Sequence, residues 1–181
     1  MKIESATKFE KKISAMLDTE GLVEVHNVSI VRTENGEIKA YPPTREYPTK
    51  DGGKGYEKIV FFKDFEAADA EAARMVNEKD EKFYEFNKPI DIKGGQKLGI
   101  ATMKAHVKLK VSVLPATEEK AARLIIPSRE YTKKGETEKK TAYFVWPFAN
   151  QGEKLKEEIA ALIEQITAEA KPYEPKEAEV E

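Results

Sequence analysis

The sequence predicts an α+β fold made of two similar β-rich units, each followed by one helix and packed as an intramolecular pseudo-dimer. The first observation is a repeated word, Pro-Thr-Arg-Glu-Tyr at residues 43–47 and Pro-Ser-Arg-Glu-Tyr at residues 127–131. The second is that each word follows a β-rich run and precedes a Lys/Gly/Glu loop, an aromatic β-branched run and an amphipathic Ala-rich stretch, in that order. Such self-similarity indicates a duplicated structural unit, and two copies are too few for a solenoid.

The repeat divides the 181 residues into three parts. The first unit covers residues 1–82 and the second covers residues 83–170. Residues 171–181 form an acidic tail that we expect to be disordered. The length allows one compact domain, or two small units that share a core.

The first unit is expected to begin with strands. Residues 8–17 have apolar positions at helical spacing, but their counterpart at 97–103 runs directly into a β pattern, so we interpret them as a strand. Residues 22–32 alternate, with a change of phase near Asn27 that indicates a bulge. Asn35-Gly36 then predicts a hairpin turn into a partner strand at 38–41.

Two prolines end this hairpin, because Pro42 and Pro43 cannot donate to a strand ladder. Residues 44–55 are interpreted as a loop and residues 56–62 as a strand. Asp64 is expected to cap a helix over 65–78 that has one apolar stripe. Residues 79–97 are interpreted as a linker that leads into a strand, with a turn at its paired glycines.

The second unit opens with the clearest strand of the chain. Over 101–113, apolar residues alternate with Lys104, His106, Lys108, Lys110 and Ser112, which predicts one core face and one solvated basic face. Strands are expected at 123–126 and 141–146, on either side of the second word and its Lys-rich loop. A capping-box-like start at Asn150 and Glu153 predicts the last helix, which Pro172 would stop.

Composition excludes several classes of site. The chain has no cysteine, so disulfides, thiolate metal sites and cysteine nucleophiles are absent, which suits a reducing cytoplasm. The formal net charge of −2 gives no global attraction to nucleic acid, so any such binding needs a local basic patch. No apolar run is long enough for a membrane span, and residues 1–5 lead into no signal-peptide core.

An enzyme is not expected. His26 and His106, the two histidines of the chain, lie mid-strand with no partnered nucleophile or carboxylate, so a structural or surface role is favoured. Two histidines without cysteine make a poor zinc site, and no carboxylate cluster has calcium-loop spacing. The glycines at 52–55 lie between strands, which does not fit a phosphate-binding loop before a helix. We expect no cofactor and no metal.

The remaining candidate site is a local basic surface. Two equivalent loops carry arginines and lysines, interspersed with glutamates that weaken their charge. If a pseudo-twofold axis relates the copies, these loops become symmetric, as in a dimeric DNA-binding protein. The candidate nucleic-acid-binding residues are Arg45, Lys50, Lys54, Lys58, Arg129, Lys133, Lys134, Lys139 and Lys140.

The motifs resemble one known family. Residues 22–31 (Leu-Val-Glu-Val-His-Asn-Val-Ser-Ile-Val), the Gly-bearing turn and Pro-Ser/Thr-Arg resemble the SpoVG (stage V sporulation protein G, septation regulator) family. The second copy adds Gly135-Glu136, Trp146-Pro147 and the helix from Glu153. The two matches cover nearly the whole chain except the junction and the tail. The chain departs from the family at Glu46 and Glu130, where the family has a second basic residue.

The resemblance implies a tandem SpoVG-like protein in which one chain supplies both halves of the family's homodimer. It implies a cytoplasmic, non-enzymatic regulator that binds DNA or RNA. The alternative is a protein–protein interaction module that kept the fold without binding nucleic acid. We expect a monomer with an internal pseudo-twofold axis, with further oligomerisation possible, and no membrane partner.

Overall fold

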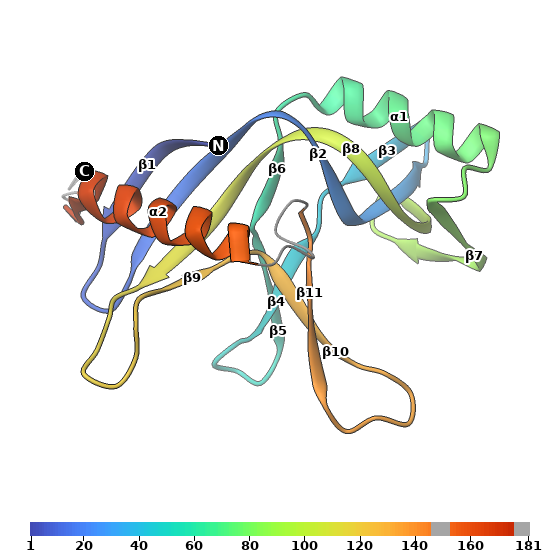
Figure 1. The fold of residues 1–181 in the computed structure, drawn as a ribbon. Coiled ribbons are helices and arrows are strands. Elements are labelled where there is room, and N and C mark those ends of the chain that lie inside the picture. Colours follow the sequence, from blue (N-terminus) through green and yellow to red (C-terminus); the bar gives the residue numbers. More distant parts are fainter. Residues whose placement is uncertain (146–152, 176–181) are drawn as a thin grey trace, which may run out of the picture.

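A computed structural model describes residues 1–145 and 153–175, with only the backbone described at 153–156. The fold is α+β, built mostly of strands with two helices. One 8-stranded sheet forms the body, and two separate 2-stranded hairpins extend from it (Figure 1). The strands are β1 (Lys2–Lys8), β2 (Ile13–Thr33), β3 (Ile38–Tyr41), β4 (Thr44–Pro48), β5 (Lys54–Lys58), β6 (Val60–Phe62), β7 (Phe83–Ile92), β8 (Gly95–Leu114), β9 (Arg123–Ile125), β10 (Ser128–Thr132), β11 (Lys139–Tyr143) and β12 (Lys171–Pro172).

Two long strands, β2 and β8, form the centre of the main sheet. They pair antiparallel from Ile13 opposite Val113 to Thr33 opposite Gly95. The ladder shifts register between Asp18 and Leu22 and again between Val25 and Val28, and both bulges contain a residue with positive φ, Glu20 and Asn27. Bulges of this kind increase the local twist, and both lie on β2. The bulge predicted near Asn27 is therefore confirmed.

In each half of the chain, a short segment pairs with the long central strand that belongs to the other half. β6 pairs with β8, and Val145 forms a bridge with Val25 of β2. Similar backbone hydrogen bonds flank the two contacts: the Lys110 amide donates to the Ile59 carbonyl at 2.9 Å, and the His26 amide donates to the Phe144 carbonyl at 2.7 Å. Residues before and after position 82 thus contribute strands to one shared sheet.

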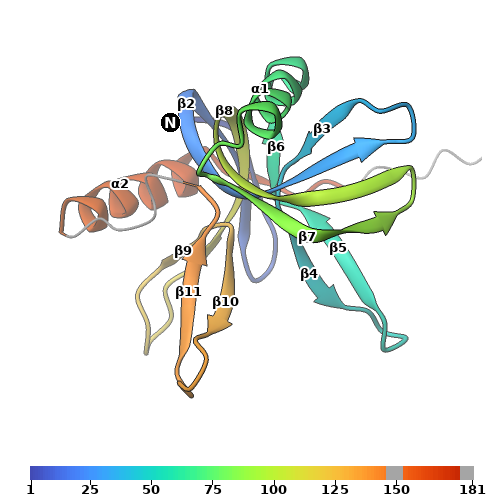
Figure 2. The same cartoon turned by 90° about the vertical axis from the view of Figure 1, so that its right-hand side faces the viewer.

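Both helices pack apolar residues onto this sheet. Helix α1 (Phe65–Glu78) buries Ala68, Ala72 and Met75, and the predicted cap is confirmed because the Asp64 side chain accepts from the Ala67 amide at 2.9 Å. Helix α2 (Glu153–Glu169) contributes Leu162 and Ile166 to the same core. In both views α1 lies on the side of the sheet away from the two hairpins (Figures 1 and 2).

Several sequence-based expectations were wrong in detail. Residues 44–55 are not a loop, because β4 pairs with β5 in a regular antiparallel hairpin whose turn is residues 49–53. The single strand expected at 56–62 is interrupted at Ile59, where the chain leaves β5 and begins β6 in the main sheet. Residues 79–97 are not a linker, because β7 pairs with β8 along most of its length. The strand interpretation of residues 8–17 holds from Ile13, and residues 9–12 are the turn after β1.

The first residues of the tail, which was expected to be disordered, contact the N-terminal part of the chain. β12 pairs in parallel with β1, and the ring of Tyr173 stacks on that of Phe9 with centroids 5.0 Å apart. Helix α2 ends at Glu169, just before Pro172. The expected cap at Asn150, the strand end at Trp146 and the tail beyond residue 175 lie outside the described residues.

Asp18 is a buried carboxylate at the first bulge of β2. Hydrogen bonds from the Lys63 ammonium (2.6 Å) and the Glu20 amide (2.8 Å) hold its pKa below the ordinary 3.8. A carboxylate with a lowered folded-state pKa contributes stability above the unfolded pKa, and this contribution is lost as the pH falls through the folded value. Asp18→Asn is therefore expected to destabilise the protein at neutral pH and to reduce its loss of stability below pH 3.8.

Urea unfolding of both proteins over a series of pH values checks this expectation. Asp51→Asn, at an exposed carboxylate in the β4–β5 turn, serves as the matched control and should leave the pH profile unchanged. Parallel profiles for the parent and Asp18→Asn would show that Asp18 is not linked to acid unfolding.

Candidate nucleic-acid interface

All nine predicted binding residues lie on the two hairpins. Arg45, Lys50, Lys54 and Lys58 belong to β4, β5 and the turn between them, and Arg129, Lys133, Lys134, Lys139 and Lys140 belong to β10, β11 and their turn. Both hairpins extend from the same side of the main sheet and diverge toward their tips (Figures 1 and 2). The fold therefore turns two segments far apart in sequence into a pair of basic arms.

The turns of both hairpins use glycine where the backbone requires a positive φ. Gly52 has φ 78° and Gly135 has φ 87°. The first turn is closed by the Thr49 amide, which donates to the Gly53 carbonyl at 3.0 Å, and the second by the Glu136 amide, which donates to the Lys133 carbonyl at 3.0 Å. The Lys/Gly/Glu loops of the sequence are thus hairpin ends that carry exposed lysines.

Glutamates pair with part of this positive charge. Lys54 contacts Glu46 at 2.9 Å, and this contact raises the pKa of Lys54. On the other hairpin Lys139 contacts Glu130 at 3.1 Å, and Lys140 contacts Glu136 at 2.6 Å. Exposed pairs of this kind are weak, so a phosphate can compete for these lysines. Among the described side chains, those of residues 1–145 and 157–175, no ion pair involves the remaining four lysines, Lys50, Lys58, Lys133 and Lys134.

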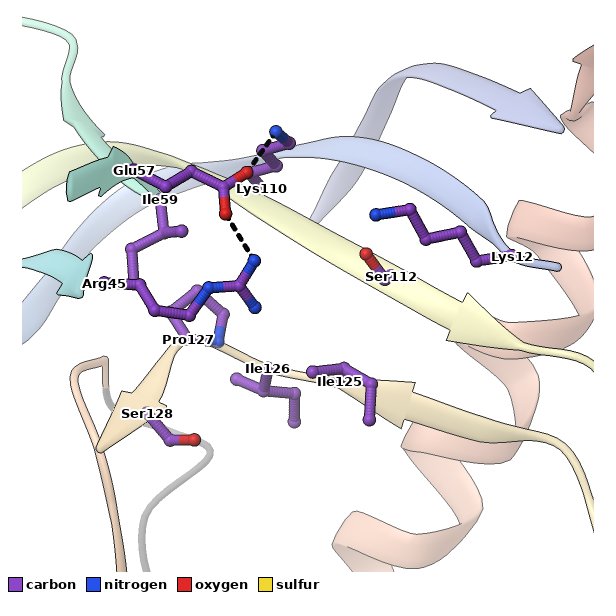
Figure 3. A pocket seen from close by; sticks show the side chains of 10 residues that line it. All are labelled: Lys12, Arg45, Glu57, Ile59, Lys110, Ser112, Ile125, Ile126, Pro127 and Ser128. Atoms are coloured by element: carbon purple, nitrogen blue, oxygen red, sulfur yellow. Dashed lines mark hydrogen bonds and ion pairs between the residues drawn. The ribbon is translucent and has the colours of Figure 1, made fainter. Parts of the chain in front are cut away.

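Arg45 is held at the base of the first hairpin. Glu57 lies directly opposite it on β5, and one carboxylate oxygen of Glu57 accepts from the guanidinium while the other accepts from the Lys110 ammonium at 2.5 Å (Figure 3). Hydrogen bonds from Lys110 and then Arg45 lower the pKa of Glu57, so it remains ionised. The hollow beside this cluster has a volume of only ≈ 60 Å³.

Arg129 occupies the same register position of the second hairpin with different neighbours. Ala142 lies opposite it on β11, where the first hairpin has Glu57. In the described part of the chain, no carboxylate lies within ion-pair distance of Arg129. Arg129 borders a cleft of ≈ 530 Å³, which is within the range of ligand-binding pockets. The two hairpins therefore differ most at their arginines.

The cleft beside Arg129 combines aromatic, basic and hydroxyl groups. Tyr131 comes from β10 and Tyr84 from β7, and both rings are exposed. Lys82 also lines the cleft, and its ammonium contacts Glu24 at 2.9 Å. His26 binds the Thr102 hydroxyl through Nδ1 at 3.2 Å, while its enclosed Nε2 lies 3.4 Å from Glu24 without hydrogen-bond geometry.

Sequence reasoning missed the cleft residues that come from β2, β7 and β8. Tyr84 and Lys82 fall in the stretch that was interpreted as a linker, and His26 was assigned to a plain strand. The sequence signal for these residues was the run Phe-Tyr-Glu-Phe at 83–86, because aromatic residues are enriched in strands.

The basic face expected on the long strand is largely neutralised. The alternation itself is confirmed over residues 101–113. Lys108 contacts Glu4 at 2.8 Å, and Lys110 is engaged by Glu57. This face therefore adds less free charge than the sequence indicates, and the hairpins remain the main basic surface.

Comparisons with known proteins gave no match to a protein-family model, to a curated protein or to a solved structure. The resemblance to the SpoVG family therefore rests on the residues alone, and function has to be argued from geometry. In the described residues, no group of three or more histidines and carboxylates could hold a metal ion. Neither described helix is long and apolar enough to cross a bilayer.

Proposed function

We propose that the chain is an intramolecular pseudo-dimer of SpoVG-like type and a non-enzymatic, cytoplasmic regulatory protein that binds nucleic acid with its paired hairpins. The observation that carries the proposal is the placement of the repeated Arg-bearing word on two hairpins that extend from one side of the sheet. Arg45 and Arg129 stand at the second position of β4 and β10, each near the base of its arm.

The pairing pattern supports the pseudo-dimer. The order of three sheet strands, a hairpin, a crossing segment and a helix occurs twice along the chain, and each crossing segment joins the long strand of the other unit. The two amide-to-carbonyl bonds at Lys110 and His26 occupy matching places in this pattern. A homodimer of a single unit would use the same contacts between two chains.

The charge distribution supports nucleic acid as the ligand. Exposed Lys50, Lys133 and Lys134 lie at the hairpin turns, where they can follow a phosphate backbone as point charges. Arginine adds a planar fork that can hold a phosphate through two hydrogen bonds. Because several lysines are paired with glutamates, we expect weak and strongly salt-dependent binding, with a dissociation constant of about 10⁻⁴–10⁻⁶ M.

A titration against fluorescently labelled single- and double-stranded DNA and RNA, at several salt concentrations, tests the proposal. We expect log K to fall linearly with the logarithm of the salt concentration, because counterions are released from the phosphates on binding. No detectable binding at low salt, to any of the four ligands, would contradict it.

That negative outcome would favour the second candidate, a protein–protein interaction module. The specific observation for this candidate is the pairing of Lys54 with Glu46 and of Lys139 with Glu130, which gives both arms a mixed charge. A surface of mixed charge suits a protein partner better than a polyanion.

A further inference from the structure

We infer that the two arms are functionally unequal. The cleft beside Arg129 receives one nucleotide of a single strand, with its phosphate on the guanidinium and its base against the tyrosines. The equivalent place at Arg45 is closed. The inference rests on the proposed nucleic-acid binding. It adds the form of the ligand and assigns it to one hairpin, with the tyrosines, Thr102 and Asn27 of the cleft as its contacts.

Among the described residues no carboxylate pairs with the guanidinium of Arg129, so a phosphate can approach it. At the equivalent position Arg45 already donates to Glu57, and Glu57 is held ionised by Lys110 as well. A phosphate approaching Arg45 would have to displace this carboxylate in a hollow of ≈ 60 Å³. The substitution of Ala142 for the cross-strand glutamate leaves Arg129 without that competitor.

Exposed aromatic rings beside Arg129 provide places for a base. Tyr84 is 69% exposed and Tyr131 is 39% exposed, although both line the cleft. On the first hairpin the ring of Tyr47 lies against Gly55, so closely that a Cβ there would overlap it. The residue opposite Tyr131 is Lys140 instead. Tyr131 therefore has no glycine opposite it for its ring to lie on, whereas Tyr47 has Gly55.

The arrangement favours a single strand over a duplex. A base can stack on a side chain only when it is unpaired and splayed out, and aromatic platforms next to a basic track are how single strands are bound without sequence readout. Thr102 and Asn27 at the cleft wall offer hydrogen bonds to a base edge. Lys133 and Lys134 at the tip of the same hairpin continue the track for neighbouring phosphates.

The test exchanges the one residue that distinguishes the two arms. Ala142→Glu places a carboxylate opposite Arg129, as Glu57 is opposite Arg45, and is expected to weaken single-strand binding as much as Arg129→Ala does. Ala142→Gln has the same size without the charge and is expected to retain binding. Glu57→Ala, which releases Arg45 from its carboxylate partner, is expected to tighten binding. Circular dichroism and thermal unfolding verify that each variant is folded.

The probes are a labelled 12-nucleotide single strand and the blunt duplex of the same sequence. We expect the parent protein to prefer the single strand by about fivefold or more, since stacking on an aromatic side chain strengthens binding of each base by that order. Tyr84→Ala should reduce this preference by weakening binding of the single strand.

The outcomes separate this inference from the proposed function. Equal affinity for both probes, or an Ala142→Glu variant that binds like the parent, would overturn the inference while nucleic-acid binding stands. Absence of binding to either probe would remove the proposed function itself. A loss of binding in Ala142→Gln equal to that in Ala142→Glu would show that bulk rather than charge is responsible, which also contradicts the inference.

Discussion

Replacing Leu109 with alanine is expected to lower the free energy of unfolding by about 2–5 kcal/mol. Leu109 is fully buried in β8, opposite Leu17 of β2 on one side and Val60 of β6 on the other. Its side chain therefore lies where the two long strands meet a crossing segment. The neighbouring atoms cannot close the cavity that the shorter side chain leaves, because β-strands on both sides fix the backbone. The variant therefore loses both the transfer free energy of the deleted atoms and their packing contacts.

Chemical denaturation of the parent and the Leu109→Ala variant measures this loss. The matched control is Leu22→Ala, because Leu22 also lies in a long central strand but is 61% exposed at a bulge. Its stability should change by at most about 0.5 kcal/mol. Similar losses for both leucines would contradict the assignment of the core to the junction between β2, β6 and β8.

Removing both arginines of the repeated word, in an Arg45→Ala/Arg129→Ala variant, is expected to weaken oligonucleotide binding and to flatten the slope of log K against log salt by roughly 1–2 units. Each lost phosphate contact releases about one counterion fewer. The larger share of the affinity loss should come from Arg129, because Arg45 is engaged by Glu57.

Fluorescence anisotropy titrations over a salt series measure the slope. An Arg32→Ala/Lys93→Ala variant removes the same charge at the β2 end and the β7–β8 turn, away from the hairpins, and should keep the parent slope. If both double variants flatten the slope equally, binding depends on overall charge and not on the arms.

The sequence predicted the fold class and the central strand alternation because those depend on local periodicity. Asp64, the Asn-Gly turn and the one-sided run at 101–113 each specify their own structure within a few residues. β4 was missed because Pro43 precedes it, Pro48 ends it and all of its residues are exposed, so it lacks the pattern of a half-buried strand. β7 was missed for a similar reason, since nearly all of it is exposed at the edge of the sheet.

The candidate site was predictable only in part. The repeated word placed Arg45 and Arg129 on equivalent elements, because a repeat in sequence transfers directly to a repeat in secondary structure. The cross-strand partners were not predictable, since the register that sets Glu57 opposite Arg45 and Ala142 opposite Arg129 depends on turn length. The cleft could not be found from sequence, because its walls come from β2, β7, β8 and the second hairpin.

Mapping of amide chemical shifts during titration with a short single-stranded oligonucleotide tests most directly the claim that the hairpin side binds nucleic acid. The account predicts shifts concentrated in residues 128–143 and at Tyr84 and Thr102, smaller shifts in residues 44–58, and unchanged amides in α1. Shifts confined to the helices, or a spectrum that does not change at low salt, would contradict it.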